Sequence, residues 1–278
     1  MKLIADCGST KIEWCLVDNG NVVERWFSPG VNALMQTEEE MRSQFKETVS
    51  PVIGEREVSH IYFYGAGCVS PEVCGSVKRA LADTVAAGEI EVDSDMIAVA
   101  RALCQHEKGI ACIMGTGSNS CVYDGTKIID AVSPLGYILG DEGSGAVLGK
   151  ILVGDVLKRQ LPEELCQKFL EKYDLDRIKI INRVYREPRA NAFLASLTPF
   201  LLENIEEPSI HRLVLNAFKL FFVRNISNYA DYKTLKIHFV GSIGYYYREV
   251  LEEAAAAVDC HIGKVVVSPM DGLIKYHG

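Results

Sequence analysis

Apolar and polar residues alternate near the start of the chain in a way that predicts three short strands. Residues 3–5 form a short apolar run, residues 12–17 alternate in part, and residues 22–26 begin and end with apolar side chains; polar or glycine-containing stretches separate these segments. Asp18-Asn19-Gly20 is a strong hairpin signal, because Asn-Gly accepts the positive φ angles that a tight turn requires. The chain therefore opens with strands joined by turns.

Helices and strands alternate after this opening. Apolar spacing predicts strands over residues 60–64 and 90–92, and helices over 37–49, 71–86 and 96–103. Thr37 precedes three glutamates and is placed to cap the first of these helices.

The opening pattern begins again about a hundred residues further along. Residues 109–114 are apolar, a Gly/Ser turn follows at 115–120, and short strands over 121–123 and 127–132 flank a second tight turn. A unit that occurs twice at this separation indicates duplication of a fold rather than a short-period repeat. Two unrelated hairpins can look alike, so the pattern alone leaves chance similarity open.

The rest of the chain is mostly helical, with residues 211–229 predicted as a helix whose apolar stripe packs in the core. Strands over 235–240 and 264–267 and helices over 245–258 and 270–276 follow. Polar residues 105–108 divide the chain into an N-terminal domain, 1–106, and a C-terminal domain, 107–278. The second domain carries the helical insertion, and its last residues are able to pack back on the first. We expect the two domains to pack closely with a cleft between them.

Composition limits the classes of partner. The chain has 278 residues, 48% of them hydrophobic, which is enough for two cores. Its formal net charge is −8, and an acidic chain is a poor candidate for binding nucleic acid or an anionic membrane. The sequence shows neither a signal peptide pattern nor an apolar run long enough to span a bilayer, so we expect a cytoplasmic protein.

Nine cysteines are present, an odd number, and they form no Cys-x-x-Cys pair. Several lie within apolar runs, so we expect reduced, buried thiols. The scattered cysteines and histidines predict no zinc or iron–sulfur site.

The turn after the first strand could bind phosphate. It reads Asp6-Cys-Gly8-Ser9-Thr10-Lys11, and glycine, hydroxyl side chains and successive backbone N–H groups can line an anion. A carboxylate at the strand end can hold Mg²⁺ through water. Taken alone, the turn could equally be a structural hairpin with Lys11 in solvent.

A second such turn, Gly115-Thr116-Gly117-Ser118-Asn119-Ser120, occupies the equivalent place in the second half. Two anion-binding turns in a duplicated fold could grip one polyphosphate. The chain contains neither a Walker-type Gly-x-x-x-x-Gly-Lys-Ser/Thr motif nor a Gly-x-Gly-x-x-Gly after its first strand.

Three further stretches carry candidate chemistry. Gly140-Asp141-Glu142-Gly143-Ser144-Gly145 could be a ligand loop or an ordinary acidic helix start. Ser94-Asp95 could be a helix cap, or Asp95 could be a general base, with Asp93 as its nearest rival. Gly241-Ser-Ile-Gly244, between a strand and a helix, could support a nucleoside or its phosphates.

These motifs, in this order, resemble the N-acetylglucosamine kinase group of the BadF/BadG/BcrA/BcrD ATPase family, in the actin, sugar kinase and Hsp70 superfamily. The resemblance covers nearly the whole chain, and the Gly-Thr-Gly-Ser-Asn and Gly-Asp-Glu-Gly-Ser pair is its specific part. It implies an α/β fold of two ribonuclease-H-like domains that close over ATP and an amino sugar, with Mg²⁺. It also suggests a homodimer.

The resemblance further implies roles for individual residues. The sugar 6-hydroxyl would lose its proton to Asp95, and Asp6 would hold Mg²⁺ through water. The ATP phosphates would meet Gly8, Ser9, Thr10, Lys11, Thr116, Gly117 and Ser118. Adenosine would meet Gly241, Ser242, Ile243, Gly244 and Tyr245. The sugar would meet Asn32, Ser94, Asp95, Asn119 and Asp141.

One stretch departs from the family. Mammalian-type members carry Gly-Gly-Trp-Gly-His before the acidic loop, whereas this chain has Ser133-Pro134-Leu135-Gly136-Tyr137. Proline has no N–H donor, so a backbone contact to the sugar is in doubt. N-acetylmuramic acid, glucosamine and glucose therefore stay open as acceptors. An ATPase that activates a partner enzyme, or a non-enzymatic sugar sensor, stays open as the function.

Overall fold

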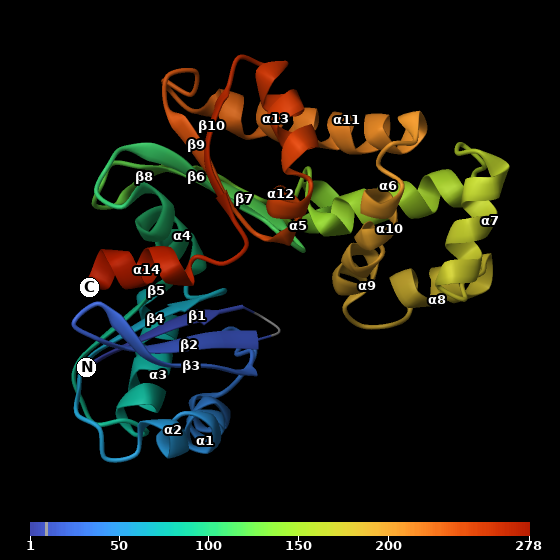
Figure 1. Ribbon diagram of the computed structural model, residues 1–278. Coiled ribbons are helices and arrows are strands. Elements are labelled where there is room, and N and C mark those ends of the chain that lie inside the picture. The colour runs from blue at the N-terminus through green and yellow to red at the C-terminus, as the bar shows by residue number, and fades with distance from the viewer. Residues whose placement is uncertain (9–10) are drawn as a thin grey trace. The chain divides into compact units, whose positions relative to one another are not determined.

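The computed structural model describes residues 1–8 and 11–278, and the chain divides into two compact units. Unit 1 comprises residues 1–107, 125–127 and 268–278, and unit 2 comprises residues 108–124 and 128–267. Each unit is built on a five-stranded sheet of parallel and antiparallel strands (Figure 1). Ser9 and Thr10 lie outside the described residues.

Unit 1 contains most of the first half of the chain and the last helix. Its strands are β1 (Lys2–Cys7), β2 (Lys11–Asp18), β3 (Asn21–Pro29), β4 (Val58–Gly65) and β5 (Ala87–Ser94). Its helices are α1 (Glu38–Thr48), α2 (Ser50–Ile53), α3 (Pro71–Ala82), α4 (Asp95–Cys104) and α14 (Met270–His277).

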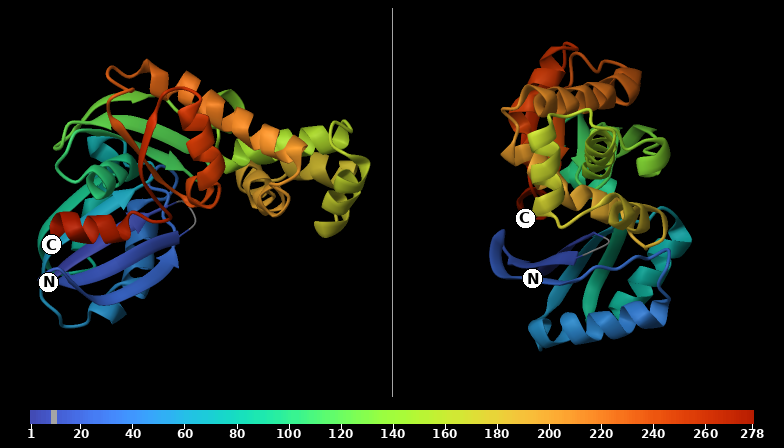
Figure 2. Two further views of the ribbon diagram at one scale, coloured as in Figure 1. Left: turned by 45° about the horizontal axis from the view of Figure 1, so that its top comes forward. Right: turned by 90° about the vertical axis from the view of Figure 1, so that its right-hand side faces the viewer.

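Strand alternation gives the sheet of unit 1 two apolar faces. Successive side chains of β1 point to opposite faces, so Leu3 and Ala5 join one core and Ile4 joins another. The first core is covered by α1 and α3 and contains Phe45, whereas the second is covered by α4 and α14. Figures 1 and 2 show these two helical layers. Because both faces of the sheet are covered, most residues of the central strand β1 are buried.

Unit 2 begins with the strands β6 (Gly109–Met114), β7 (Ser118–Tyr123) and β8 (Ile128–Val132) and includes β9 (Lys236–Val240) and β10 (His261–Val266). Between β8 and β9 lie α5 (Gly136–Leu139), α6 (Gly145–Leu157), α7 (Glu163–Lys172), α8 (Arg177–Tyr185), α9 (Ala190–Ser196), α10 (Thr198–Glu203), α11 (Pro208–Arg224) and η1 (Ile226–Asn228). The helices α12 (Ser242–Tyr246) and α13 (Arg248–Ala256) follow β9.

The two sheets have the same strand order. In unit 1 it is β3-β2-β1-β4-β5, and in unit 2 it is β8-β7-β6-β9-β10. In each sheet the first three strands form an antiparallel meander, and the remaining strands are added parallel to the first. The prediction of a duplicated α/β fold is therefore confirmed.

Several predicted helix boundaries were wrong. The helix expected over 71–86 ends at Ala82, where Asp83 forms the C-cap. The helix expected over 245–258 begins earlier and is two helices, α12 and α13, which meet at Tyr247. The side chain of Tyr247 is buried, and its hydroxyl donates to the carbonyl of Thr198 at 2.6 Å. This long-range bond fixes the break, and the local sequence contains no signal for it.

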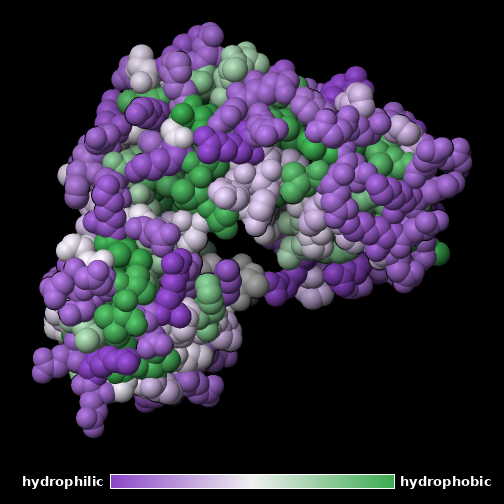
Figure 3. All heavy atoms as spheres, in the orientation of Figure 1, coloured by the Kyte–Doolittle hydropathy of each residue, from purple (hydrophilic) through white to green (hydrophobic). Residues whose placement is uncertain are grey.

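Among residues 1–8 and 11–278, no helix combines the length and apolar character needed to cross a bilayer. The part of the surface over α7 and α8 that Figure 3 shows is mostly hydrophilic. This agrees with the charged residues that these two helices carry.

Candidate active site

Asp6 and Asp95 lie at the same edge of the sheet of unit 1. Cys7 pairs with Gly65, and Gly65 pairs with Ser94, so the three parallel strands end level with one another. Asp6 is the penultimate residue of β1, and Asp95 is the first residue of α4, directly after β5. The register of the sheet therefore brings together two carboxyl groups that are far apart in the sequence.

The charge state of Asp6 is strongly perturbed. Burial raises the pKa of Asp6 to about 7, the negative charges of Glu13 and Asp95 add to this effect, and Lys11 opposes it. Glu13 is the residue of β2 directly opposite Asp6. A half-buried carboxyl group with two acidic neighbours is poised to accept a cation.

Ser94 caps α4, so the structural interpretation of this residue is confirmed. Its hydroxyl accepts a hydrogen bond from the backbone N–H of Ile97 at 3.3 Å. The cap fixes Asp95 in the first helical turn. Burial raises the pKa of Asp95, and the backbone N–H groups of Met96 and of Asp95 itself oppose the rise.

The surroundings of Asp93 differ from those of Asp95. The Asp93 carboxylate lies 3.6 Å from the guanidinium of Arg101, which also binds Glu91 and the hydroxyl of Tyr64. Burial raises the pKa of Asp93, Arg101 opposes the rise and Glu91 adds to it. Asp93 therefore belongs to an ion-pair network, whereas Asp95 is electrostatically coupled to Asp6.

The other predicted residues of unit 1 that the structure describes, Asn32, Gly8 and Lys11, lie near this edge. Asn32 is exposed, and its side-chain oxygen accepts from the N–H of Leu34 at 3.1 Å. The N–H of Gly8 donates to the carbonyl of Lys11, the first residue of β2, at 3.0 Å. The ammonium of Lys11 lies 4.7 Å from the centroid of the Phe27 ring. The predictions for Ser9 and Thr10 fall outside the described residues.

Two glycine-rich loops form one structure in unit 2. The N–H of Gly145 donates to the carbonyl of Gly115 at 2.8 Å, and the N–H of Ala146 donates to the carbonyl of Thr116 at 3.0 Å. The buried hydroxyl of Ser118 donates to the carbonyl of Glu142 at 2.8 Å. The turn after β6 and the acidic loop before α6 are therefore locked together. Ser144 caps α6, as an ordinary helix start requires.

The adjacent carboxylates of the acidic loop have different surroundings. Glu142 is bound by Arg224 through its guanidinium at 2.5 Å and by the Asn225 amide at 3.3 Å. Asp141 accepts backbone N–H groups from Ser118 and Gly136, and burial nevertheless raises its pKa to about 6. Glu142 is therefore held in the scaffold, whereas Asp141 has hydrogen-bonding capacity for a ligand.

Gly241 brings a third loop to the same place. It has a φ of 121°, and a Cβ atom there would lie 2.4 Å from the carbonyl oxygen of Met114. Ser242 to Tyr246 form α12 rather than the turn that the sequence predicts, so Gly241 alone makes the turn. A pocket of about 340 Å³ adjoins this helix and is lined by Ala195, Ser196, Thr198, Pro199, Leu202, Ser242, Ile243, Tyr246 and Tyr247.

The predicted adenosine residues divide around this pocket. Ser242 and Ile243 line it, whereas Gly241, Gly244 and Tyr245 do not. Tyr245 is exposed, and its ring packs edge-on against that of Tyr246. Asn119, on β7, accepts the N–H of Ser120 with its side-chain oxygen at 2.8 Å.

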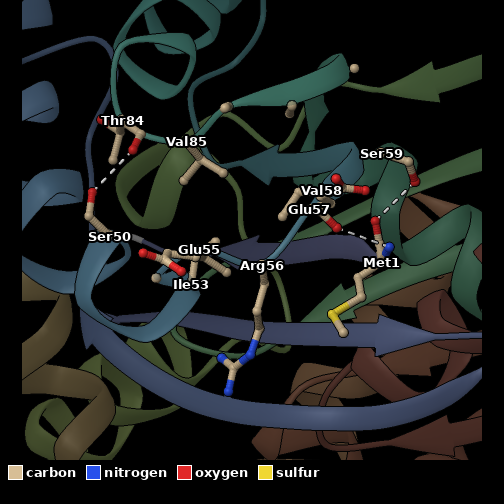
Figure 4. A pocket seen from close by; sticks show the side chains of 14 residues that line it. Met1, Ser50, Ile53, Glu55, Arg56, Glu57, Val58, Ser59, Thr84 and Val85 are labelled. Carbon is tan, nitrogen blue, oxygen red and sulfur yellow. Dashed lines mark hydrogen bonds between the residues drawn. The ribbon is translucent and has the colours of Figure 1, made fainter.

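Another pocket, of about 660 Å³, lies at the opposite edge of the unit 1 sheet (Figure 4). Its lining includes Met1, Arg56 and Ser59, near the beginnings of β1 and β4. It contains none of the predicted site residues. Its size therefore does not make it the candidate active site.

Sequence reasoning missed residues that support the site. Glu13 could have been found from the predicted hairpin, because strand pairing places it opposite Asp6. No local sequence pattern marks the other supporting residues, because each reaches the site from a distant element. They are Arg224, which binds Glu142, and Thr198 and Tyr247, which line the pocket beside α12. Their roles follow only from the packing of unit 2.

Comparisons with known proteins agree with this architecture. The sequence is 45% identical to that of a putative N-acetylglucosamine kinase from Porphyromonas gingivalis. The crystal structure of that protein superposes with a TM-score of 0.95, and the match covers 100% of this chain and 98% of that one. A second putative N-acetylglucosamine kinase, from Chromobacterium violaceum, is 18% identical with a TM-score of 0.75 and coverage of 100% and 98%. A ROK family glucokinase from Streptomyces griseus, in complex with glucose and AMPPNP, is 12% identical with a TM-score of 0.58 and coverage of 99% and 97%. No family model and no curated protein matches the chain.

Two units of this strand order, each with helices on its sheet, define the class of actin-like ATPase folds. The identity and coverage shared with the Porphyromonas protein decide the group within that class. The chain belongs to the N-acetylglucosamine kinase group that its motifs resemble.

Proposed function

We propose that this protein is an ATP-dependent sugar kinase that phosphorylates the 6-hydroxyl of N-acetylglucosamine. The observation that carries the proposal is the pair formed by Asp6 and Asp95 at the carboxyl edge of the unit 1 sheet. Phosphoryl transfer needs charge neutralisation at the phosphates and a base at the acceptor hydroxyl, and this pair supplies a group for each task. The 45% identity to a putative kinase of this sugar supports the choice of acceptor.

The phosphates of ATP are assigned to the two turns that follow β1 and β6. In unit 1 the phosphate-binding residues would be Gly8 and Lys11, with Ser9 and Thr10, which lie outside the described residues. In unit 2 they would be Thr116, Gly117 and Ser118. The adenosine is assigned to α12 and the pocket beside it, where Ser242 and Ile243 meet a largely apolar wall. The glucokinase that carries AMPPNP shares this fold, which supports the use of ATP.

The residues around Asp6 fit a divalent cation. Among the described residues, no hydrogen-bond donor is assigned to the Asp6 carboxyl group, and burial, followed by the charges of Glu13 and Asp95, raises its pKa. A positive charge beside Asp6 would offset the part of this rise that comes from the two acidic neighbours. Asp6 would hold Mg²⁺ through water, and Mg²⁺ when bound supplies neutralisation of phosphate charge.

Asp95 is assigned as the base. Burial raises its pKa, which makes it a stronger proton acceptor than an exposed aspartate, and its capped helix keeps it in place. Asp93 is less suited, because Arg101 holds its carboxylate. Asn32, Ser94, Asn119 and Asp141 are assigned to the hydroxyl and amide groups of the sugar.

The test is release of ADP from ATP and Mg²⁺ in the presence of a panel of sugars, with the product identified by phosphorus NMR. We expect release that depends on N-acetylglucosamine and a product phosphorylated at position 6. If ADP release depends only on another sugar, N-acetylglucosamine is not the acceptor, but the proposal that the protein is a sugar kinase stands. Hydrolysis that ignores every sugar would instead favour an ATPase that acts on a partner protein, and ligand binding without turnover would favour a sensor.

We also propose that the protein is a homodimer, as the resemblance suggests. Light scattering coupled to size exclusion would measure the mass in solution. A mass of about 31 kDa, that of one chain, would contradict a dimer.

A further inference from the structure

Two cysteines of unit 1 have their thiol groups in contact. Cys68 lies in the turn between β4 and α3, and Cys74 is the fourth residue of α3. The two thiols are free, and the Cys68 thiol donates a hydrogen bond to the sulfur of Cys74. The contact arises because the turn folds back onto the start of the helix, where the N–H of Cys74 donates to the carbonyl of Ser70 at 3.0 Å.

The turn that contains Cys68 is tightly packed. The N–H of Cys68 donates to the carbonyl of Gly65 at 3.1 Å, and a Cβ atom on Gly65 would lie 2.9 Å from the Cys68 sulfur. Cys68 belongs to the apolar core under α1 and α3, and the Cys74 side chain packs against the same core. The sulfur of Cys68 is therefore held in place beside α3.

The two thiols differ in their access to solvent. Cys68 is buried, whereas Cys74 is only half-buried. Burial raises the pKa of both thiols, and the hydrogen bond from Cys68 partly opposes the rise at Cys74. Because the thiolate is the nucleophile in exchange reactions, Cys74 is the thiol that a dissolved oxidant meets first. Cys68 is then placed to react with the product.

We propose that Cys68 and Cys74 form a reversible disulfide with a small-molecule disulfide such as oxidised glutathione, and that this disulfide lowers kinase activity. The sulfur of Cys74 attacks one sulfur of the oxidant and releases one molecule of glutathione. The sulfur of Cys68 then attacks that of Cys74 and releases the second. Each departing glutathione takes up the proton that the attacking thiol has lost. The protein thiols supply two electrons, and these reduce the oxidant.

Contact in the folded protein favours this pairing over others. Groups that are already oriented toward each other react as though their concentration were very high, so a mixed disulfide at Cys74 is short-lived. Cys7 is the alternative partner of Cys68, because its charge also acts on the Cys68 thiol. The thiol of Cys7 instead donates to the carbonyl of Val31 at 3.4 Å, and only 1% of this residue is exposed.

The disulfide would disturb the edge of the sheet that carries the candidate active site. A disulfide holds its sulfur atoms about 2.0 Å apart, so the turn must move toward α3. The same turn contains Gly67, whose Cβ position lies 3.3 Å from Leu34 Cγ and 3.8 Å from the side-chain oxygen of Asn32. Asn32 is assigned to the sugar, so this effect on activity rests on the proposed kinase function. A misplacement of about 1 Å can cost about 100-fold in rate.

The first test maps the disulfide. Wild type is incubated with oxidised glutathione at mildly alkaline pH, the remaining thiols are alkylated, and peptides are identified by mass spectrometry. We expect a disulfide between Cys68 and Cys74 that dithiothreitol removes. Alkylation of both residues would overturn the inference, and so would a disulfide that joins Cys68 to Cys7.

Cys68→Ala and Cys166→Ser sharpen this test. Cys68→Ala should keep glutathione bound to Cys74, because no thiol remains to displace it. Cys166 is the matched control, since it is also the fourth residue of a helix, α7. Its thiol donates to the carbonyl of Leu161 at 3.6 Å and not to a sulfur. Cys166→Ser should therefore form the same disulfide as the wild type.

The second test measures activity after oxidation. We expect kcat/KM for the sugar to fall about 10–100-fold in the wild type and in Cys166→Ser, and to recover with dithiothreitol. Cys74→Ser should keep its activity in the same treatment. An unchanged circular dichroism spectrum would show that the oxidised protein stays folded. A disulfide that forms without changing kcat/KM would overturn its effect on activity.

The two tests separate this inference from the proposed function. Peptide mapping detects the disulfide whether or not the protein phosphorylates a sugar. A wild type that forms the disulfide and phosphorylates no sugar overturns the proposed function and the effect on activity, and it leaves the redox pair established. An active kinase whose Cys68 and Cys74 stay reduced overturns this inference alone.

Discussion

The backbone N–H of Gly145 donates to the carbonyl oxygen of Gly115 at 2.8 Å. This bond joins the start of α6 to the turn after β6, and Gly241 packs against the same turn. Loops that are separate in sequence therefore form one rigid structure in unit 2. Substitutions that disturb one loop should affect the others.

Gly241→Ala should destabilise unit 2. The new Cβ would lie 2.4 Å from the carbonyl oxygen of Met114, and the φ of 121° is unfavourable for alanine. We expect the free energy of unfolding to fall by about 2–4 kcal/mol, measured by urea titration. The control is Gly154→Ala, in α6 with open space around its Cβ, which should raise stability by up to about 1 kcal/mol. Equal stabilities for Gly241→Ala and the wild type would contradict the packing described for this loop.

Asp95→Asn should lose turnover and keep nucleotide binding. An amide cannot accept the acceptor proton, so we expect kcat to fall at least about 100-fold, while ATP affinity measured by calorimetry is retained. Asp93→Asn is the control. It should keep kcat, because Arg101 retains Glu91 as a partner. A normal kcat in Asp95→Asn would exclude Asp95 as the base.

Acceptor binding should weaken in acid because of Asp141. Its pKa is raised to about 6 by burial, so its carboxylate is lost as pH falls through that value. A protonated carboxyl group has less capacity to accept sugar hydroxyls, and KM for the sugar should rise between pH 7 and pH 5. Asp141→Asn should raise KM at every pH and remove this dependence. A KM profile that is flat for the wild type would contradict a sugar contact at Asp141.

The same residue should oppose stability at neutral pH. A raised pKa in the folded state means that the folded protein binds the proton of Asp141 more tightly than the unfolded chain does. Protonation of Asp141 therefore stabilises the fold below about pH 4, and this stabilisation is lost as pH rises through 6. We therefore expect Asp141→Asn to be more stable than the wild type at pH 7 by about 1–2 kcal/mol. Urea titration at pH 7 tests this, and a less stable variant would show that the ionised carboxylate is needed by the fold.

His238 should make unit 2 sensitive to acid. Burial lowers its pKa to about 4, and its Nδ1 atom accepts the N–H of Lys264 at 2.9 Å. Protonation would destroy this acceptor. Since the folded pKa lies below the ordinary value of 6.5, stability is full above that value and falls as pH decreases toward 4. We expect a loss of about 1–2 kcal/mol between pH 7 and pH 5, and a smaller loss in His238→Gln.

Local sequence was sufficient for turns and caps. Asn19 and Gly20 both have positive φ, as the hairpin signal predicts. Thr37 forms a complete capping box with Glu40, and Ser94 caps α4. These features depend on contacts within a few residues, so the sequence contains all the information that they require.

Local sequence was not sufficient for the choice between Asp93 and Asp95. Both residues are aspartates, only Ser94 lies between them, and both lie near the end of β5. Only packing shows that Arg101, reaching back from α4, occupies Asp93, and that Asp95 shares its surroundings with Asp6. Such assignments depend on partners that are distant in the chain.

The sequence by itself determined the strands, most of the helices, the duplicated pattern and the positions of the glycine-rich turns, because hydrophobic period and turn chemistry are local properties. Tertiary structure decided that α14 joins unit 1, that Tyr247 breaks the helix after β9, and that Leu135 is held in a strained, exposed conformation. Each of these depends on contacts that form only when distant segments pack, and a one-dimensional pattern does not specify which segments will meet.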